Sequence, residues 1–289
     1  MGSDKKQEEI HAVSLQTGAL IKTYRLFVSL TGDWEAISLG PCTSASNSTT
    51  CIYIQNAGDN AAQRCSSRKC TGGRNDLYIY KLPEPNISQV DKYNGTRLKV
   101  VTLRYNYSHS SWPTNQADSE AMFVDWTGDA RGGKRGDIYI MTKQPYNRRD
   151  QRIGKIPVEL HEKLVPITDS KSANYYIEVK AVSKASVEVP WTGADMSRDG
   201  NLIAARRESR VYFFSRDITA NQTVEDAMMS APCNFVSETD MSNNNTLQAE
   251  SVAFMDNSYI IEASECYNKL PCTVPVPKYR LIFNKTISD

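Results

Sequence analysis

The chain has 289 residues, of which 40% are hydrophobic and 23% are charged, and its formal net charge is +1. This composition is typical of a globular protein that can bury a core, and the small net charge gives no electrostatic reason to expect binding to nucleic acid or to an anionic membrane. No apolar run approaches the roughly 18 residues that a membrane-spanning helix needs, so we expect no membrane span.

Short β-strand patterns run through the chain in groups. After a polar tail at residues 1–9, strand-like runs at 10–15 and 20–28 are joined by Gln16, Thr17 and Gly18, which form a hairpin signal. A unit of four strands follows, with runs at residues 35–39, 52–55, 77–82 and 98–106.

The pattern of this unit returns three times. The second unit has runs at 120–125, 137–143, about 153–164 and 175–189, and the third at 194–197, 202–206, 211–215 and 234–237, with a short helix expected at 223–230. The fourth unit has runs at 250–254, 259–263 and 279–284 and lacks a fourth strand.

Tandem units of four antiparallel strands with an irregular period are typical of a β-propeller, in which each unit is one blade. We therefore predict an all-β fold in which residues 10–289 form a single β-propeller domain of about four blades plus a partial one. The run at 20–28 is a candidate for the strand that the fourth unit lacks. The run at 10–15 is then left over, which indicates a five-bladed parent whose first blade is incomplete.

Each unit begins with an acidic residue at the start of its innermost strand, and these residues are Glu35, Glu120, Asp195 and Glu250. In a propeller this position faces the central channel, so we expect the four carboxylates to converge. Like charges raise one another's pKa, and a hard cation such as Ca²⁺, which prefers oxygen ligands, would relieve the repulsion. Asp59 and Asn60 could add oxygen ligands.

Two other roles for these acids stay open. Each acid can accept hydrogen bonds from backbone amides of the neighbouring blade and so fix the spacing between blades, which is a structural role. The third role is direct acid–base chemistry.

The cysteines and the glycosylation sequons favour an extracellular protein. Six of the seven cysteines form close pairs, which we expect to be disulfides, and Cys233 is left over: the pairs are Cys42 with Cys51, Cys65 with Cys70 and Cys266 with Cys272. Seven asparagines begin N-x-S/T sequons: Asn47, Asn86, Asn94, Asn106, Asn221, Asn244 and Asn284. Residues 1–12 are polar and do not form a signal peptide, so we expect a leader to be missing; the alternative is a cytosolic protein with reduced cysteines.

Three motifs carry a resemblance: DWEAISLGP at 33–41, YIQNAGDN at 53–60 and LYIYKLPEP at 77–85. They resemble motifs of secreted propeller proteins of poorly defined function, in which DWE and GDN mark one blade. More remotely, the repeated acid and the turn SRDGN at 197–201 are similar to calcium-dependent propeller hydrolases of the gluconolactonase and paraoxonase kind, and to phytase-like and esterase-like propellers. This second resemblance is one of architecture, so it does not indicate which reaction, if any, this chain catalyses.

Two functions are consistent with these observations. The first is an extracellular binding or scaffold protein whose acidic channel mouth takes a small-molecule, glycan or protein ligand. The second is a calcium-dependent hydrolase of the esterase, lactonase or phosphatase type, in which Ca²⁺ held by the same acids polarises the substrate. No histidine occupies a repeat-equivalent position, which favours the binding protein.

Overall fold

The computed structural model describes residues 9–28, 33–58, 77–87, 97–107, 117–144, 152–166, 175–187, 189–207, 210–237, 247–266 and 278–280. Nearly all regular elements in these ranges are β-strands. The exceptions are a short 3₁₀ helix, η2 (Val158–Leu160), and a six-residue helix, α1 (Val224–Met229). None of the helices in these ranges has the length and hydrophobicity to cross a membrane.

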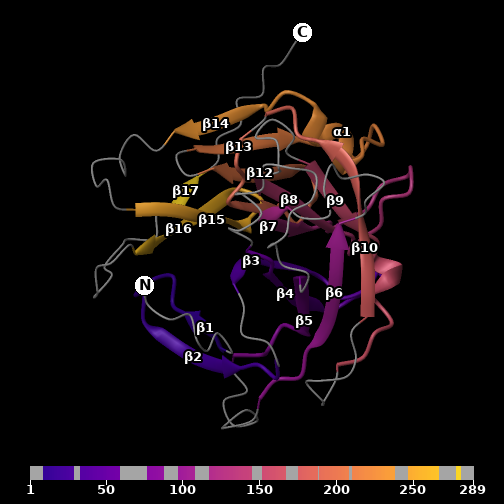
Figure 1. Ribbon diagram of the computed structural model, residues 1–289. Coiled ribbons are helices and arrows are strands. Elements are labelled where there is room, and N and C mark those ends of the chain that lie inside the picture. The colour runs from indigo at the N-terminus through magenta and orange to yellow at the C-terminus, as the bar shows by residue number, and fades with distance from the viewer. Residues whose placement is uncertain are drawn as a thin grey trace.

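The strands from β3 onwards form four successive groups, antiparallel within each group, which are the blades of a β-propeller (Figure 1). The first blade comprises β3 (Trp34–Pro41), β4 (Thr50–Asn56), β5 (Leu77–Pro83) and β6 (Val101–Tyr107). The second comprises β7 (Asp118–Val124), β8 (Ile138–Gln144), β9 (Arg152–Ile156) and β10 (Tyr175–Lys184). The third comprises β11 (Gly193–Met196), β12 (Leu202–Arg207), β13 (Arg210–Ser215) and β14 (Asn234–Ser237), and the fourth β15 (Leu247–Asp256), β16 (Tyr259–Cys266) and β17 (Lys278–Arg280).

The first strand of each blade is the innermost one. β3 contacts β7, β7 contacts β11, and β11 contacts β15, so these four strands surround a common centre while the later strands lie outside them (Figure 1). The predicted all-β propeller with four-stranded blades is thereby confirmed for the first three blades, and the fourth has three strands within the described ranges.

The first two blades are also joined at their outer edges. β6 pairs with β10 in parallel, from Leu103 opposite Tyr175 to Tyr107 opposite Val179, so that one continuous sheet runs β3-β4-β5-β6-β10-β9-β8-β7. The sequence patterns did not predict this pairing.

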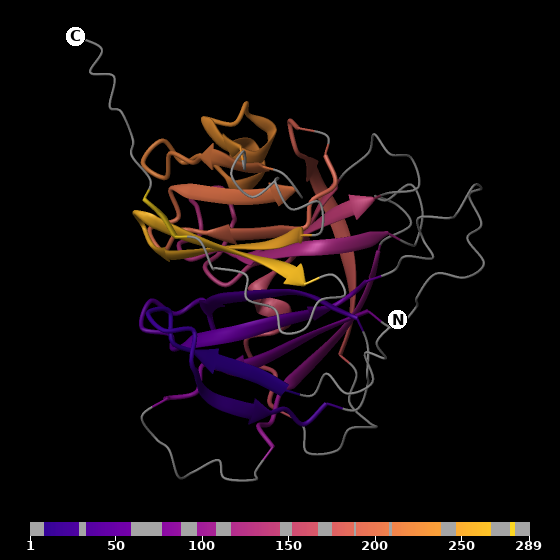
Figure 2. The same cartoon turned by 90° about the vertical axis from the view of Figure 1, so that its left-hand side faces the viewer.

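The N-terminal hairpin does not close the fourth blade, which corrects the prediction made for residues 20–28. β1 (Glu9–Val13) and β2 (Leu20–Arg25) form a separate two-stranded sheet. Leu26 then bridges Leu98 in parallel and is buried with Ile54 and Tyr80 against the first blade. Ile10 of β1 packs against the same cluster, so the hairpin lies on this face of the first blade. Figure 2 shows the hairpin beside the first blade, below the orange and yellow strands of the third and fourth blades.

Burial explains the apolar composition of the central strands. Every residue of β5 from Leu77 to Leu82 is buried, because the second blade covers one face of this strand and the hairpin packs against the other. The outer strand β6 alternates instead between buried and partly buried residues. A strand covered on both faces requires a continuous apolar run, whereas a half-covered strand alternates.

Each junction between successive blades contains a buried polar contact. Arg206 on β12 pairs with Glu262 on β16 at 2.7 Å, which joins the third blade to the fourth. Arg216, after β13, pairs with Asp125, after β7, at 3.1 Å and joins the third blade to the second. Removing one partner of such a pair leaves a buried charge, so these contacts fix which blade faces meet.

The contact between the first and second blades involves Lys81 and His161. The Lys81 ammonium donates to the carbonyl oxygen of Cys42 at 2.5 Å and lies 3.1 Å from Nδ1 of His161. Burial lowers the pKa of Lys81 to about 8 and that of His161 to about 3, so His161 is neutral and accepts this hydrogen bond at neutral pH.

Candidate cation site at the channel mouth

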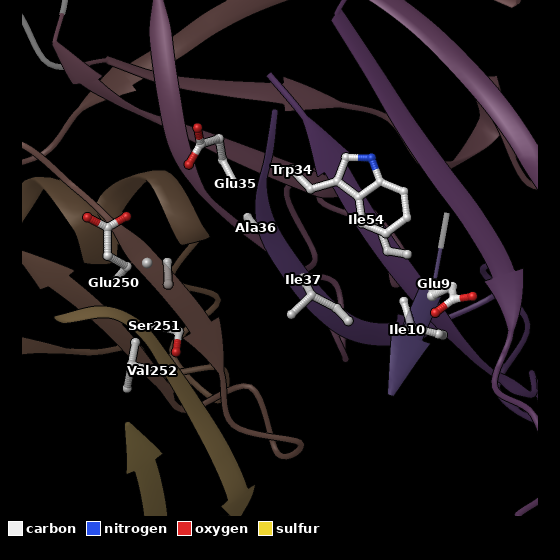
Figure 3. Close-up of a pocket in the computed structure, with 12 residues that line it drawn as sticks. Glu9, Ile10, Trp34, Glu35, Ala36, Ile37, Ile54, Glu250, Ser251 and Val252 are labelled. Carbon is white, nitrogen blue, oxygen red and sulfur yellow. The ribbon is translucent and has the colours of Figure 1, made fainter. Parts of the chain in front are cut away.

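Three of the four repeated acids converge at one end of the channel. Glu35 on β3, Glu120 on β7 and Glu250 on β15 each contribute a carboxylate oxygen, and these three oxygens lie within 4.8 Å of one another. Glu120 is 3% exposed, and the other two are partly buried. Figure 3 shows the side chains of Glu35 and Glu250 extending towards the same region from opposite strands.

Each of these glutamates is the extra residue of a β-bulge. In β3 the pairing passes from Trp34 to Ala36, in β7 from Ser119 to Ala121 and in β15 from Ala249 to Ser251, while β4, β8 and β16 continue without a matching gap. A bulge redirects the side chain of its unpaired residue. The same irregularity in three blades therefore turns three carboxylates to one point.

Asp195 does not join this group, although it occupies the equivalent position in the third blade. β11 pairs with β12 in regular register through Ala194, Asp195 and Met196 and has no bulge. The carboxylate of Asp195 instead accepts a hydrogen bond from the backbone amide of Phe254 on β15 at 2.8 Å. For Asp195 the structure therefore favours the structural role over the metal-ligand role.

One lysine lies beside the cluster. Lys143 on β8 pairs with Glu120 at 2.5 Å, and it is itself the unpaired residue of a bulge, since Thr142 pairs with Ser119 and Gln144 with Asp118. The ammonium favours the ionised form of the Glu120 carboxyl, against the effect of burial.

Two further acids lie around the cluster, so five carboxyl groups are close together. Asp33 interacts with Glu35, and the buried Asp118 with Glu120. Burial, followed by repulsion from Glu120 and Asp33, raises the pKa of Glu35 to about 9. Burial and then repulsion from Asp118 raise the pKa of Glu120 to about 8, although Lys143 acts against this shift. Without a counter-charge both carboxyls hold protons at neutral pH.

Asp33 and Asp118 were not among the predicted site residues. A signal was present, since Asp33 precedes Glu35 by two residues and Asp118 precedes Glu120 by two. Gly58 was also missed. A Cβ at this position would overlap the carboxylates of Glu35 and Asp33, so a larger residue here would displace them from their present positions. Asp59 and Asn60, the other predicted oxygen ligands, lie outside the described residues.

The spacing of the three oxygens suits a large divalent cation. Three points at most 4.8 Å apart share a centre at most 4.8/√3, or about 2.8 Å, from each of them. Ca²⁺ binds oxygen at about 2.3–2.6 Å, whereas Mg²⁺ requires about 2.0–2.1 Å. At the limit of about 2.8 Å, a small inward movement of the side chains satisfies Ca²⁺, whereas a larger one is needed for Mg²⁺.

A pocket of about 330 Å³ lies next to the cluster, between β3 of the first blade and β11 and β15 of the third and fourth. Glu35 and Glu250 line it, together with Trp34, Ile37 and other apolar side chains (Figure 3). The channel mouth thus combines an acidic cluster with an adjacent cavity.

One of the predicted disulfides can be checked. Cys42 and Cys51 form a disulfide that joins the end of β3 to β4, with a Cα–Cα distance of 5.0 Å, as predicted. The pairs Cys65–Cys70 and Cys266–Cys272 lie outside the residues whose side chains are described. The Cys233 thiol is exposed and donates to the carbonyl oxygen of Phe213 at 3.2 Å.

The sequon asparagines differ in exposure. Asn47, Asn86 and Asn221 are exposed, whereas Asn106 lies within β6 and is partly buried. Asn94, Asn244 and Asn284 lie outside the described ranges. Three sequons are thus accessible at the surface.

Comparisons with known proteins add little to this description. No protein-family model and no curated protein matches the chain. Similar solved structures include the Dos1 propeller, with 7% identity and a TM-score of 0.33 over 89% of this chain and 48% of that one. Another is the complex of KlAtg21 with the coiled-coil of AgAtg16, with 10% identity and a TM-score of 0.34 over 90% of this chain and 58% of that one. The chain spans about half the length of these structures, and at such TM-scores the likeness carries no argument of its own.

Proposed function

We propose that the protein is a secreted, glycosylated β-propeller that binds an extracellular ligand at its acidic channel mouth, where Ca²⁺ is held by Glu35, Glu120 and Glu250. The observation that carries this proposal is the convergence of three bulged glutamates, with oxygens within 4.8 Å of one another. The ligand is a small molecule, a glycan or a protein.

The charge balance supports a bound cation. Among the residues that the structure describes, five carboxyl groups interact around the one ammonium of Lys143: those of Asp33, Glu35, Asp118, Glu120 and Glu250. A divalent ion with oxygen ligands lets these groups ionise together. In its absence the raised pKa values of Glu35 and Glu120 keep both groups protonated at neutral pH.

Two separate features support the proposed extracellular location. The Cys42–Cys51 disulfide requires an oxidising environment, and Asn47, Asn86 and Asn221 offer exposed acceptors for glycans.

A binding role is better supported than the alternative, a calcium-dependent hydrolase of the esterase, lactonase or phosphatase type. In the part of the chain that the structure describes, neither histidine joins the acidic group: His11 contacts Thr23 in the hairpin, and His161 is buried against Lys81. No imidazole base is therefore placed at the cluster within these ranges.

The test is calcium binding to the full chain, measured by calorimetry and by thermal melts in CaCl₂ and in EGTA. At a calcium concentration about 100 times the dissociation constant, the folded state gains about 2.7 kcal/mol, which is a rise in melting temperature of roughly 5 °C for a chain of this size. Glu120→Gln should abolish the gain.

The matched control is Asp195→Asn, which removes the charge of the equivalent residue in the third blade and should leave calcium binding intact. If the wild-type melting curves in CaCl₂ and EGTA coincide and no heat of binding is detected, the cation site is refuted. Calcium-dependent turnover of an ester or phosphoester that Glu120→Gln abolishes would replace the binding role with the hydrolase.

A further inference from the structure

The pocket beside the acidic cluster has an apolar wall. Trp34 and Ile37 of β3, Ile54 of β4 and Ile10 of β1 form this wall, and Figure 3 shows them on the side away from Glu250. Ile37 is 58% exposed although it lines the pocket, so an apolar surface faces the opening and is free to be covered. An apolar wall of this kind gains free energy when a ligand covers it.

The charge of the pocket lies at its other end. Glu9 also lines the pocket, but it pairs with Arg25 at 2.8 Å. The carboxyl groups at this end of the pocket are those of Glu35 and Glu250, and a cation bound between them favours their ionised forms; no basic side chain is among the described residues that line the cavity. A ligand is thus offered carboxylates at one end and an apolar wall at the other.

We propose that this pocket binds a small organic cation, namely a primary ammonium group carried on an apolar body, with the ammonium at Glu35 and Glu250 and the body against Trp34, Ile37 and Ile54. This inference rests on the proposed function, since it takes the channel mouth to be the binding site, and it specifies the class of ligand.

The dimensions favour a small molecule. A cavity of about 330 Å³ is at the lower end of the range of roughly 300–1,000 Å³ typical of small-ligand pockets. It has room for one aromatic ring and a short chain, and the indole of Trp34 offers an aromatic surface for such a ring. An anionic ligand is opposed by both glutamates, and an uncharged ligand forgoes the charge-assisted hydrogen bonds that they offer.

The experiment is calorimetric titration of the full chain in EGTA with three ligands of similar shape: phenethylamine, phenethyl alcohol and phenylacetate. The amine should bind at least about tenfold more tightly than the alcohol, and phenylacetate should not bind. Equal affinity for the amine and the alcohol would overturn the proposal.

A matched pair of variants locates the site. Ile37→Lys places an ammonium in the pocket and should weaken binding of the amine by about tenfold or more. Leu39→Lys adds the same charge to the same face of β3, two residues further along and outside the pocket, and should change the affinity by less than about twofold. Both positions are exposed, so both variants are expected to fold. Equal losses in the two variants would count against the pocket as the site.

Calcium titrations of the same samples separate this inference from the proposed function. Glu120 is a proposed calcium ligand that does not line the pocket, so Glu120→Gln should lose calcium binding and retain binding of the amine. Binding of calcium without binding of the amine would overturn the present inference alone. Binding of the amine without binding of calcium would overturn the cation site and support the pocket.

Discussion

Replacing Glu35 by glutamine should stabilise the calcium-free protein at neutral pH. Glu35 has its pKa raised from 4.5 to about 9 in the folded state, first by burial and then by Glu120 and Asp33. The folded protein therefore holds this proton more tightly than the unfolded chain. It follows that the contribution of Glu35 to the stability of the folded state is largest below about pH 4.5 and is lost as the pH rises towards 9.

The size of the effect follows from the two pKa values. At about pH 7.5, three pH units above 4.5, the unfolded chain gains about 3 × 1.36, or about 4 kcal/mol, by releasing the proton. Glu35 is only partly buried, so solvent screening reduces this value, and we expect Glu35→Gln to recover about 2 kcal/mol. The glutamine amide can still donate a hydrogen bond to Asp33, as the protonated carboxyl does.

The assay is urea unfolding in EGTA at several pH values between about 5 and 9, for the wild type, Glu35→Gln and a control, Glu159→Gln. Glu159 is an exposed acid outside the cluster that pairs with Lys134, so the control should keep the wild-type slope of stability against pH. The free energies of unfolding of Glu35→Gln and the wild type should converge at low pH and separate as the pH rises. Parallel curves across the whole range would refute the assignment of the raised pKa to Glu35.

Three further outcomes are expected. Gly58→Ala places a methyl group against the carboxylates of Glu35 and should weaken calcium binding by about tenfold or more in calorimetry; an unchanged affinity would show that the backbone there can move away. Glu262→Ala leaves the buried Arg206 without its carboxylate and should lower the free energy of unfolding by about 3–5 kcal/mol in urea, and a loss below 1 kcal/mol would mean that water reaches this junction. Asp195→Ala removes the acceptor of a backbone amide and should lower the free energy of unfolding by about 1–3 kcal/mol without changing calcium affinity, so a parallel loss of calcium binding would return Asp195 to the site.

Much of the blade structure could be predicted from the sequence, because strand alternation and turn residues are local signals. Most runs in the first three blades correspond to the observed strands, although the run at about 153–164 continues past β9 through η2. The short helix begins after its N-cap Thr223, whose hydroxyl accepts from the amide of Asp226. The parallel pairing of β6 with β10 was not predictable, since alternation along a strand carries no information about which distant edge it meets. The location of the N-terminal hairpin was predicted wrongly for the same reason.

The candidate site was predicted in part. The repeat placed Glu35, Glu120 and Glu250 at equivalent positions, and the structure brings their carboxylates together. The carboxylate of Asp195 was predicted to join them and does not, because equivalence along the sequence does not reveal whether a strand contains a bulge. A bulge depends on the register between two strands, which local patterns do not specify.

The parallel pairing between the first two blades has a consequence for synthesis of the chain. Leu103 pairs with Tyr175, so 175 − 103 = 72 residues must be added before the outer edge of the first blade finds its partner. At roughly 5–20 residues per second, a ribosome leaves that strand edge uncovered for about 4–14 s. During this interval the nascent first blade offers a β-strand edge to other nascent chains, and a fragment that stops before residue 175 is expected to aggregate even though its own blade is complete.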